Sequence, residues 1–193
     1  MKFRKVFVFG MLLPLTACGG KGGSSIKGEK VEESDFSGKA AERVEAEQPN
    51  YTSAKMTAKH YQKVAGKSNS MDGYATYTRQ NGAWVSQEVN GVMTQMSTYV
   101  SIINFTMDLY ERFFSMLASY GTLTDEFYLD DNSATIHLYG DFTISGNSGT
   151  IDCVIVWNQY GMLKSYKETD NYNDYRGTGS AQVKETFTAT YSA

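Results

Sequence analysis

The sequence predicts an α+β fold, in which a curved antiparallel sheet, or half-barrel, is wrapped on one long apolar helix. Short segments of alternating apolar and polar residues recur along the chain between turn residues, as is typical of antiparallel strands. Residues 93–120 show helical periodicity and contain no Gly and no Pro. The regular strand–helix–strand alternation that indicates a parallel sheet is missing from this pattern.

The first 17 residues are typical of a secretory signal peptide. Lys2, Arg4 and Lys5 give a basic start, residues 6–15 form an apolar run, and small residues follow. The apolar run is too short for a membrane-spanning helix, which needs about 20 residues. We therefore expect the chain to be exported and residues 1–17 to be removed.

The residues Leu15-Thr16-Ala17-Cys18 at the end of this signal resemble the bacterial lipobox. The resemblance implies cleavage before Cys18 and attachment of acyl chains to that cysteine. Two or three acyl chains anchor a protein durably, because each buried methylene contributes about 0.8 kcal/mol. The resemblance therefore implies a lipid-anchored, extracytoplasmic protein of the bacterial cell envelope, with the membrane as its partner.

Residues 18–33 form a predicted flexible tether, because they are rich in Gly, Ser, Lys and Glu and have few large apolar groups. Residues 34–193 are long enough for one domain. The chain has 18 Lys and Arg against 21 Asp and Glu, and three of the basic residues lie in the predicted signal peptide. A nucleic-acid-binding protein needs the opposite balance, so we expect no nucleic-acid partner.

The first part of the domain is predicted to contain one short helix and three strands. The helix covers residues 39–48, with candidate N-cap residues at 34–37 and Pro49 at its end. The strands cover residues 51–64, 71–79 and 83–89. Asn81-Gly82 is the strongest hairpin signal in the chain and predicts a tight turn between the last two.

Residues 93–120 are predicted to form the long helix. Its apolar side chains form two neighbouring stripes, which is more than a helix packed on one layer needs. The second stripe either packs in the core or lines a cavity for a lipid or other apolar ligand. The charges at Asp108, Glu111 and Arg112 argue against a membrane span. The ligand-binding residues predicted from this stripe are Ile102, Phe105, Leu109, Phe113 and Met116.

Gly121 is the expected end of the long helix, because glycine favours the helix C-terminus. Five further strands are predicted over residues 123–129, 135–144, 150–157, 162–172 and 183–191. The last of these has the clearest alternation in the chain. In it Val183, Phe187, Ala189 and Tyr191 share one face.

The pattern over residues 35–193 resembles the lipovitellin-like half-barrel of the lipoprotein-carrier superfamily. The resemblance rests on the lipobox, the short helix, the apolar helical segment and strand pairs such as TYTRQNGAWVSQEV and VIVWNQYGMLKSYKE. Members of that superfamily hold lipids or acyl chains between helix and sheet. The resemblance implies the fold and a hydrophobic ligand, and it assigns no binding residue.

Residues that could support catalysis are few. His60 and His137 are both expected in mid-strand, and no G-x-S-x-G turn is present to supply a nucleophile. Cys153 is expected to be a small buried hydrophobe in a central strand. The sequence therefore predicts that the protein is not an enzyme.

No metal or cofactor is expected from the sequence. Neither an H-E-x-x-H motif nor paired C-x-x-C motifs occur. Residues 170–174 are rich in Asp and Asn, but Tyr172 and Tyr175 occupy positions where an EF-hand loop needs a ligand and Gly.

Two functions remain open at this level. The first is a non-enzymatic envelope lipoprotein that binds or carries a lipid or other hydrophobic ligand between helix and sheet. The alternative is a surface interaction protein with a solid core, which binds a protein partner through strand edges or tyrosines. The sequence indicates no oligomeric state.

Overall fold

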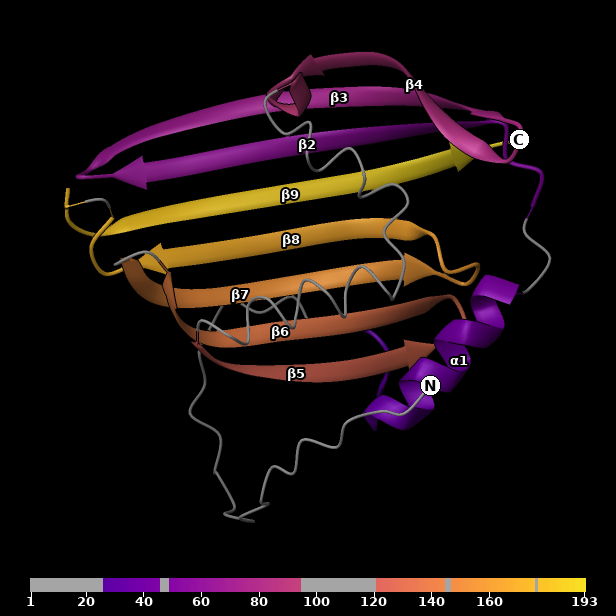
Figure 1. The fold of residues 1–193 in the computed structure, drawn as a ribbon, viewed down its shortest axis with the longest axis horizontal. Coiled ribbons are helices and arrows are strands. Elements are labelled where there is room, and N and C mark those ends of the chain that lie inside the picture. The colour runs from indigo at the N-terminus through magenta and orange to yellow at the C-terminus, as the bar shows by residue number, and fades with distance from the viewer. Residues whose placement is uncertain (1–25, 46–48, 95–120, 145–146, 176) are drawn as a thin grey trace.

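The computed structural model describes residues 26–45, 49–94, 121–144, 147–175 and 177–193. These residues form one antiparallel sheet of nine strands, with one α-helix and one short 3-10 helix (Figure 1). In chain order the elements are β1 (Glu29–Val31), α1 (Glu33–Glu45), β2 (Ser53–Val64), β3 (Lys67–Gln80), β4 (Ala83–Gly91), η1 (Val92–Thr94), β5 (Gly121–Asp130), β6 (Ser133–Ile144), β7 (Asn147–Asn158), β8 (Leu163–Tyr172) and β9 (Ala181–Ser192).

The predicted antiparallel sheet is confirmed, but the predicted α+β class is wrong. The described structure is mostly sheet, and its α-helix is the 13-residue α1 rather than a long apolar helix. The described residues at the two ends of the predicted long helix are not α-helical. Val92 and Met93 lie in η1, and Gly121 is the first residue of β5, opposite Phe142. Residues 95–120 lie outside the described part of the chain.

The strands lie in the order β1-β5-β6-β7-β8-β9-β2-β3-β4. Strands β5 to β9 form one meander and β2 to β4 form another, and pairing of β9 with β2 joins the two. This junction is long, since it pairs all residues from Ser53 to Val64 with Ser192 to Ala181. The last strand of the chain is therefore an interior strand of the sheet (Figure 1).

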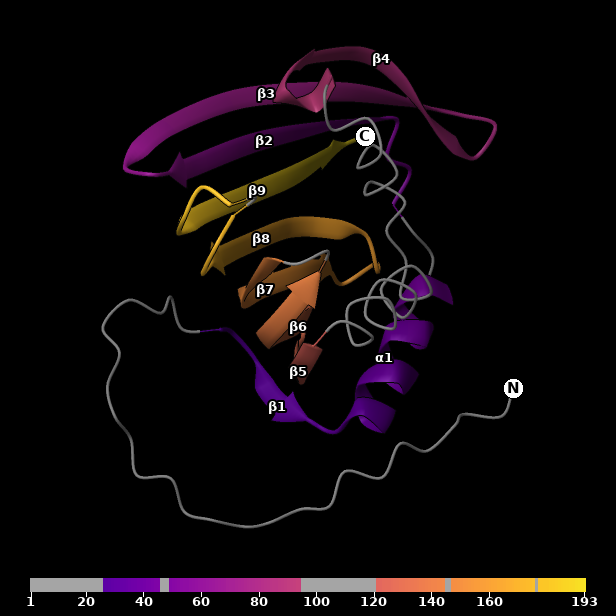
Figure 2. The same ribbon diagram turned by 60° about the vertical axis from the view of Figure 1, so that its left-hand side comes forward.

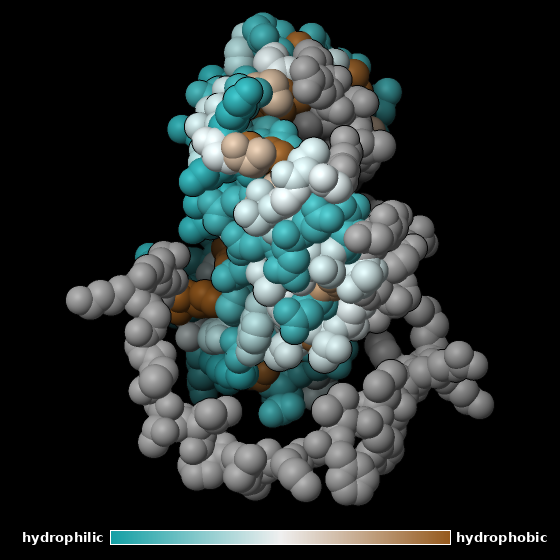
Figure 3. All heavy atoms as spheres, turned by 90° about the vertical axis from the view of Figure 1, so that its left-hand side faces the viewer, coloured by the Kyte–Doolittle hydropathy of each residue, from teal (hydrophilic) through white to brown (hydrophobic). Residues whose placement is uncertain are grey.

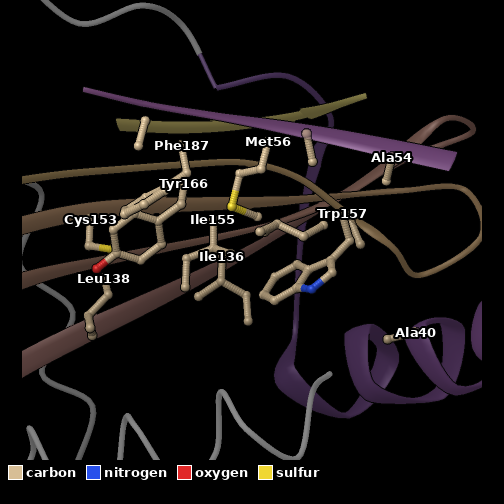
Figure 4. Packing of buried hydrophobic residues seen from close by; sticks show 14 of the residues in the cluster. Ala40, Ala54, Met56, Ile136, Leu138, Cys153, Ile155, Trp157, Tyr166 and Phe187 are labelled. Carbon is tan, nitrogen blue, oxygen red and sulfur yellow. The ribbon is translucent and has the colours of Figure 1, made fainter. Parts of the chain in front are cut away.

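The sheet has an apolar inner face and a polar outer face. Because successive side chains of a strand point to opposite faces, every second residue contributes to the inner face. Phe187, Tyr166, Ile155 and Ile136 face one another in this way across β9, β8, β7 and β6. Figure 4 shows these side chains on the same side of the sheet as α1. The remaining buried strand residues of this face include Ala54, Met56, Ala58, Ala75, Tyr77, Phe127, Ala134, Leu138, Ile151, Cys153, Trp157 and Ala189.

Helix α1 packs against the inner face next to β5 (Figure 2). Its buried residues are Phe36 and Ala40, and the Phe36 ring lies 5.1 Å from the ring of Phe127. Arg43 in its last turn donates a hydrogen bond of 2.5 Å to the backbone carbonyl of Asp130. No helix among the described residues has the length and apolar character needed to cross a membrane.

The chain folds onto the inner face directly after β4. Val92 and Met93 in η1 are buried against β3. A Cβ atom at Gly73 would lie only 2.7 Å from the Val92 nitrogen, so a glycine is needed where η1 crosses β3. The chain thus leaves the sheet directly after β4, the last strand of the second meander.

Two hairpin turns have the same backbone geometry. Asn81 and Gly82 connect β3 and β4 with φ angles of 52° and 83°, which confirms the predicted tight turn. Ala65 and Gly66 connect β2 and β3 with φ angles of 47° and 80°. Strand β3 therefore begins at Lys67, whereas the sequence predicted a start at residue 71.

The N-terminal elements extend further than the sequence pattern indicated. Strand β1, over Glu29–Val31, falls inside the predicted tether and pairs with β5. Helix α1 begins at Glu33 rather than at residue 39.

The end of the sheet that carries the β2–β3 hairpin is covered mainly by hydrophilic residues (Figure 3).

Candidate functional site

The most unusual chemistry in the described structure is a group of carboxylic acids on the apolar inner face. Strand β8 places Tyr166, Glu168, Asp170 and Tyr172 at every second position, so all of them occupy this face. Glu168 lies opposite Glu185 of β9 and opposite Cys153 of β7. We refer to Glu168, Asp170, Glu185 and His60 as the inner acidic cluster.

The carboxylates of this cluster differ in how many hydrogen-bond partners they have. The Tyr166 hydroxyl donates to Glu168. The Tyr172 hydroxyl approaches the Oδ2 atom of Asp170 at 3.5 Å, which is long for a hydrogen bond. The Oδ1 atom of Asp170 is buried and has no hydrogen-bond partner among the described residues. Asp170 is therefore the least satisfied acid of the group.

Burial and neighbouring carboxylates raise the pKa values of Glu168 and Asp170. Burial raises the pKa of Glu168 well above its usual value, and the nearby charge of Asp170 raises it further. Burial likewise raises the pKa of Asp170 to about 6. Apolar neighbours such as Ile151 and Phe187 cannot solvate a charge, and two adjacent carboxylates disfavour double ionisation. Near neutral pH the Glu168–Asp170 pair is therefore best described as sharing about one negative charge.

His60 and Glu185 form the second half of the cluster. The His60 Nδ1 atom lies 3.2 Å from Glu185 Oε1, and both side chains are largely shielded from solvent. The two residues are directly opposite each other in the β2–β9 pairing. Glu185 therefore has a closer hydrogen-bond partner than Asp170, whose Oδ1 atom has none among the described residues.

The arrangement can accept hydrogen bonds or a positive charge on a surface that is largely apolar. Burying carboxylates without full compensation lowers stability, so such groups are typical of functional sites. Covalent catalysis is not favoured by the neighbouring thiol, because burial raises the pKa of Cys153 well above its usual value. Figure 4 shows the Tyr166 hydroxyl directed toward the Cys153 sulfur. Within the described residues no group of His, Cys, Asp and Glu is arranged to hold a metal ion.

A second polar group, on the outer face, is well paired and connects strands. Glu126 of β5 contacts Lys30 of β1 at 2.7 Å, accepts a 2.7 Å hydrogen bond from Tyr128, and lies 3.5 Å from His137. His137 also contacts Asp152 of β7 at 3.2 Å. Although burial alone would raise it, the bonds from Lys30 and Tyr128 lower the pKa of Glu126 to about 2. This group connects β1, β5, β6 and β7 through side-chain contacts.

The predicted site residues are placed as follows. Cys18 and the predicted ligand-binding residues Ile102, Phe105, Leu109, Phe113 and Met116 lie outside the described part of the chain. The expectation of mid-strand histidines is confirmed for His60 and His137, which both have carboxylate partners. Cys153 is confirmed as a buried residue of a central strand.

The three strand residues Tyr74, Tyr77 and Tyr166 do not share one face of the sheet. Tyr77 and Tyr166 are buried on the inner face. Tyr74 lies on the outer face, where its hydroxyl donates to Glu88. They are therefore divided between the two faces of the sheet.

The inner acidic cluster was missed by the sequence interpretation, although a signal for it existed. Glu185 occupies the same phase of β9 as Val183, Phe187 and Ala189, so a charge stood at an apolar position. Asp170 falls inside the predicted strand over residues 162–172, and β8 confirms that strand, but its side chain was considered only as a possible calcium ligand. It lies on the inner face, opposite Ile151.

Comparison with known proteins gives no family for this chain. No protein-family model matches it, and no curated protein matches it.

Proposed function

We propose that this protein is a lipid-anchored component of the bacterial cell envelope that binds a lipid or other amphiphilic ligand on the inner face of its sheet. Acyl chains on Cys18 hold the protein at the membrane. The apolar side chains of the inner face contact the hydrophobic part of the ligand. The inner acidic cluster receives a head group that donates hydrogen bonds or carries a positive charge.

One observation carries this proposal. Asp170 has a pKa raised to about 6 and a buried Oδ1 atom without a partner among the described residues, on a face made of apolar side chains. A ligand amine or hydroxyl at this position supplies the missing donor and offsets the cost of burying the acid. The apolar surroundings select a ligand with a hydrocarbon portion.

The same chemistry supports a binding function rather than catalysis. The cluster contains acceptors and one histidine, and its nearest thiol is buried with a raised pKa. Binding needs only these acceptors and an apolar surface. We therefore propose a non-enzymatic carrier or binding protein.

The test uses three probes with the same twelve-carbon chain: dodecylamine, dodecanol and dodecanoate. Each is titrated into the full-length protein above pH 7 by calorimetry. We expect the amine to bind at least about tenfold more tightly than the carboxylate, because a charge-assisted hydrogen bond contributes about 1.5–3 kcal/mol. The double variant Glu168→Gln/Asp170→Asn is expected to lose this preference and to keep binding of dodecanol.

The matched control is Asp72→Asn, which removes an exposed acid from β3 on the outer face. It is expected to bind all three probes as the wild type does. Equal affinity for amine and carboxylate in the wild type, or an unchanged preference in the double variant, would refute the role of the cluster. Failure of every probe to bind would refute ligand binding on the inner face.

The alternative, binding of a protein partner through a strand edge, is supported by β4. This strand ends the described strand order and carries Val85, which is 39% exposed. A free edge with an exposed apolar side chain can pair with a strand of another protein. Recovery of one stoichiometric protein partner without any extracted lipid would favour this alternative.

A further inference from the structure

The outer face of the neighbouring strands β8, β9 and β2 carries lysines and no carboxylate among the described residues. Strand alternation places exposed lysines from all three strands on this face. Every Asp and Glu among the described residues of these strands, namely Glu168, Asp170 and Glu185, is on the inner face. We call the outer surface of the three strands the basic face, and its lysines are Lys55, Lys59, Lys63, Lys167 and Lys184.

The lysines of the basic face form no ion pair with a described residue, although Asp72 of β3 lies directly opposite Lys59 in the β2–β3 pairing. Lys30 and Lys39 elsewhere have Glu126 and Glu42 as partners. Lys55 lies 5.2 Å from the centre of the Tyr74 ring, and Lys184 lies 5.8 Å from the centre of the Tyr61 ring. Rings of this kind support a cation but leave its charge available to an anion.

The basic face is a local concentration of positive charge on a chain with more acidic than basic residues, 21 against 18. Acidic residues begin at its borders. Asp72 and Glu88 stand on the outer side of β3 and β4, and Asp152 stands on the outer side of β7. The chain thus separates charge by strand, which gives the outer face a defined positive region.

The shape of the basic face fits an extended anionic surface better than a single small anion. Lys55 and Lys63 are separated by eight residues of β2, or roughly 26 Å, and the three strands are together roughly 10 Å wide. One phosphate can contact only a small part of such an area. Threonines and serines, such as Thr57, Thr188 and Thr190, fill the surface between the lysines.

We propose that the basic face lies against the anionic phospholipid head groups of the membrane that holds the acyl anchor. This inference rests on the proposed anchor at Cys18, which keeps the domain near the bilayer and so allows the basic face to come within the roughly 10 Å over which surface charges attract. Each lysine near an anionic membrane strengthens binding by roughly fivefold. In this orientation the inner face of the sheet is directed away from the bilayer.

The test measures protection of lysines in the full-length protein, purified with its acyl groups. The protein is placed on vesicles of phosphatidylcholine alone, or of phosphatidylcholine with about a third phosphatidylglycerol. An amine-acetylating reagent is added, and mass spectrometry gives the labelling rate of each lysine. We expect the basic-face lysines to label about fivefold more slowly on the anionic vesicles. Lys39 of α1 is expected to label equally on both.

The intact mass from the same preparation reports the acyl groups on Cys18. If they are missing, the anchor is refuted, and the labelling comparison with added vesicles still decides whether the basic face contacts them. Equal labelling of the basic-face lysines on both kinds of vesicle overturns the proposal. Retention of the protein by dextran sulfate, without any preference for anionic vesicles, overturns it in favour of a soluble polyanion.

Charge reversal provides the second arm. Lys63→Glu/Lys167→Glu changes two exposed lysines whose cross-strand neighbours are uncharged. We expect this variant to lose protection at the three remaining basic-face lysines. The matched control Lys39→Glu/Lys67→Glu changes the net charge by the same amount, and we expect it to keep the protection of the basic-face lysines. If both variants lose this protection equally, the effect depends on net charge alone, and the proposal that the basic face contacts the membrane is overturned.

Discussion

Asp170 illustrates how a single residue can oppose the pattern of its strand. It stands at an inner position of β8, between Tyr172 and Glu168, and opposite the buried Ile151. A residue at this position that served only packing would be apolar. The acid instead destabilises the fold when it is ionised, because its neighbours cannot solvate the charge.

The cost of Asp170 makes stability depend on pH in a defined direction. Its pKa is raised from 3.8 to about 6, so between about pH 4 and 6 the folded state holds a proton that the unfolded state has lost. Stability therefore falls as the pH rises through this window, and the full penalty remains above it. Asp170→Asn is expected to reduce this fall and to stabilise the protein above pH 7 by on the order of 2 kcal/mol.

Urea unfolding at several pH values between 4 and 8 measures this effect. The control Asp72→Asn changes an exposed acid of the outer face and is expected to leave the slope unchanged. An identical pH dependence in wild type and Asp170→Asn would show that Asp170 ionises in the folded state as easily as in the unfolded chain.

At the scale of elements, the two equivalent hairpin turns differ in how well their residues suit them. The first residue of each turn has a positive φ angle, and it is Asn81 in one and Ala65 in the other. Asparagine adopts this conformation readily, whereas other non-glycine residues lose roughly 1–2 kcal/mol in it. The β2–β3 turn is therefore the more strained of the two.

Ala65→Asn is expected to stabilise the protein by about 0.5–1 kcal/mol, because it gives the β2–β3 turn the residue that type I′ turns prefer. The matched control is Asn81→Ala, which is expected to destabilise the β3–β4 turn by a similar amount. Midpoints of urea unfolding measure both. If neither variant changes the midpoint of unfolding, these turns do not limit stability.

These elements also show what the sequence could predict. Asn81-Gly82 identified one hairpin in advance, and the alternation of β9 identified its strand, because both signals are local. Strand β1 was not found, since three residues are too few for a period-two pattern to stand out. Gly121 was assigned to a helix end from propensity alone. Its pairing with Phe142 is a contact between distant residues that local patterns do not contain.

The candidate site was predictable in part for the same reason. The charge of Glu185 at an apolar phase was visible in the sequence. Its proximity to Glu168 and His60 was not, because it depends on the order β8-β9-β2 and on the register of both pairings. Only the β2–β9 junction brings His60 to a residue 125 positions away.

For the whole molecule, the proposed function depends on where the protein is held. Cys18→Ser is expected to release it from the membrane fraction, or to leave the signal peptide uncut, because the sulfur that accepts the lipid is lost. Cell fractionation followed by intact mass measurement gives the result. The control is Cys153→Ala, which changes the second cysteine of the chain and is expected to leave the protein in the membrane fraction. Unchanged fractionation and processing of Cys18→Ser would contradict the anchor.

The position of β9 has a consequence for how the protein is made. The residues from Ala181 to Ser192 are synthesised after β2 and β8, the two strands that they join, and they pair with β2 along their whole length and with β8 over residues 181–188. Until they are synthesised, two separate meanders expose unpaired edges to other chains. Termination of the chain before Ala181 therefore yields two open half-sheets prone to aggregation, and the folding machinery of the cell has to tolerate this open intermediate until β9 is complete.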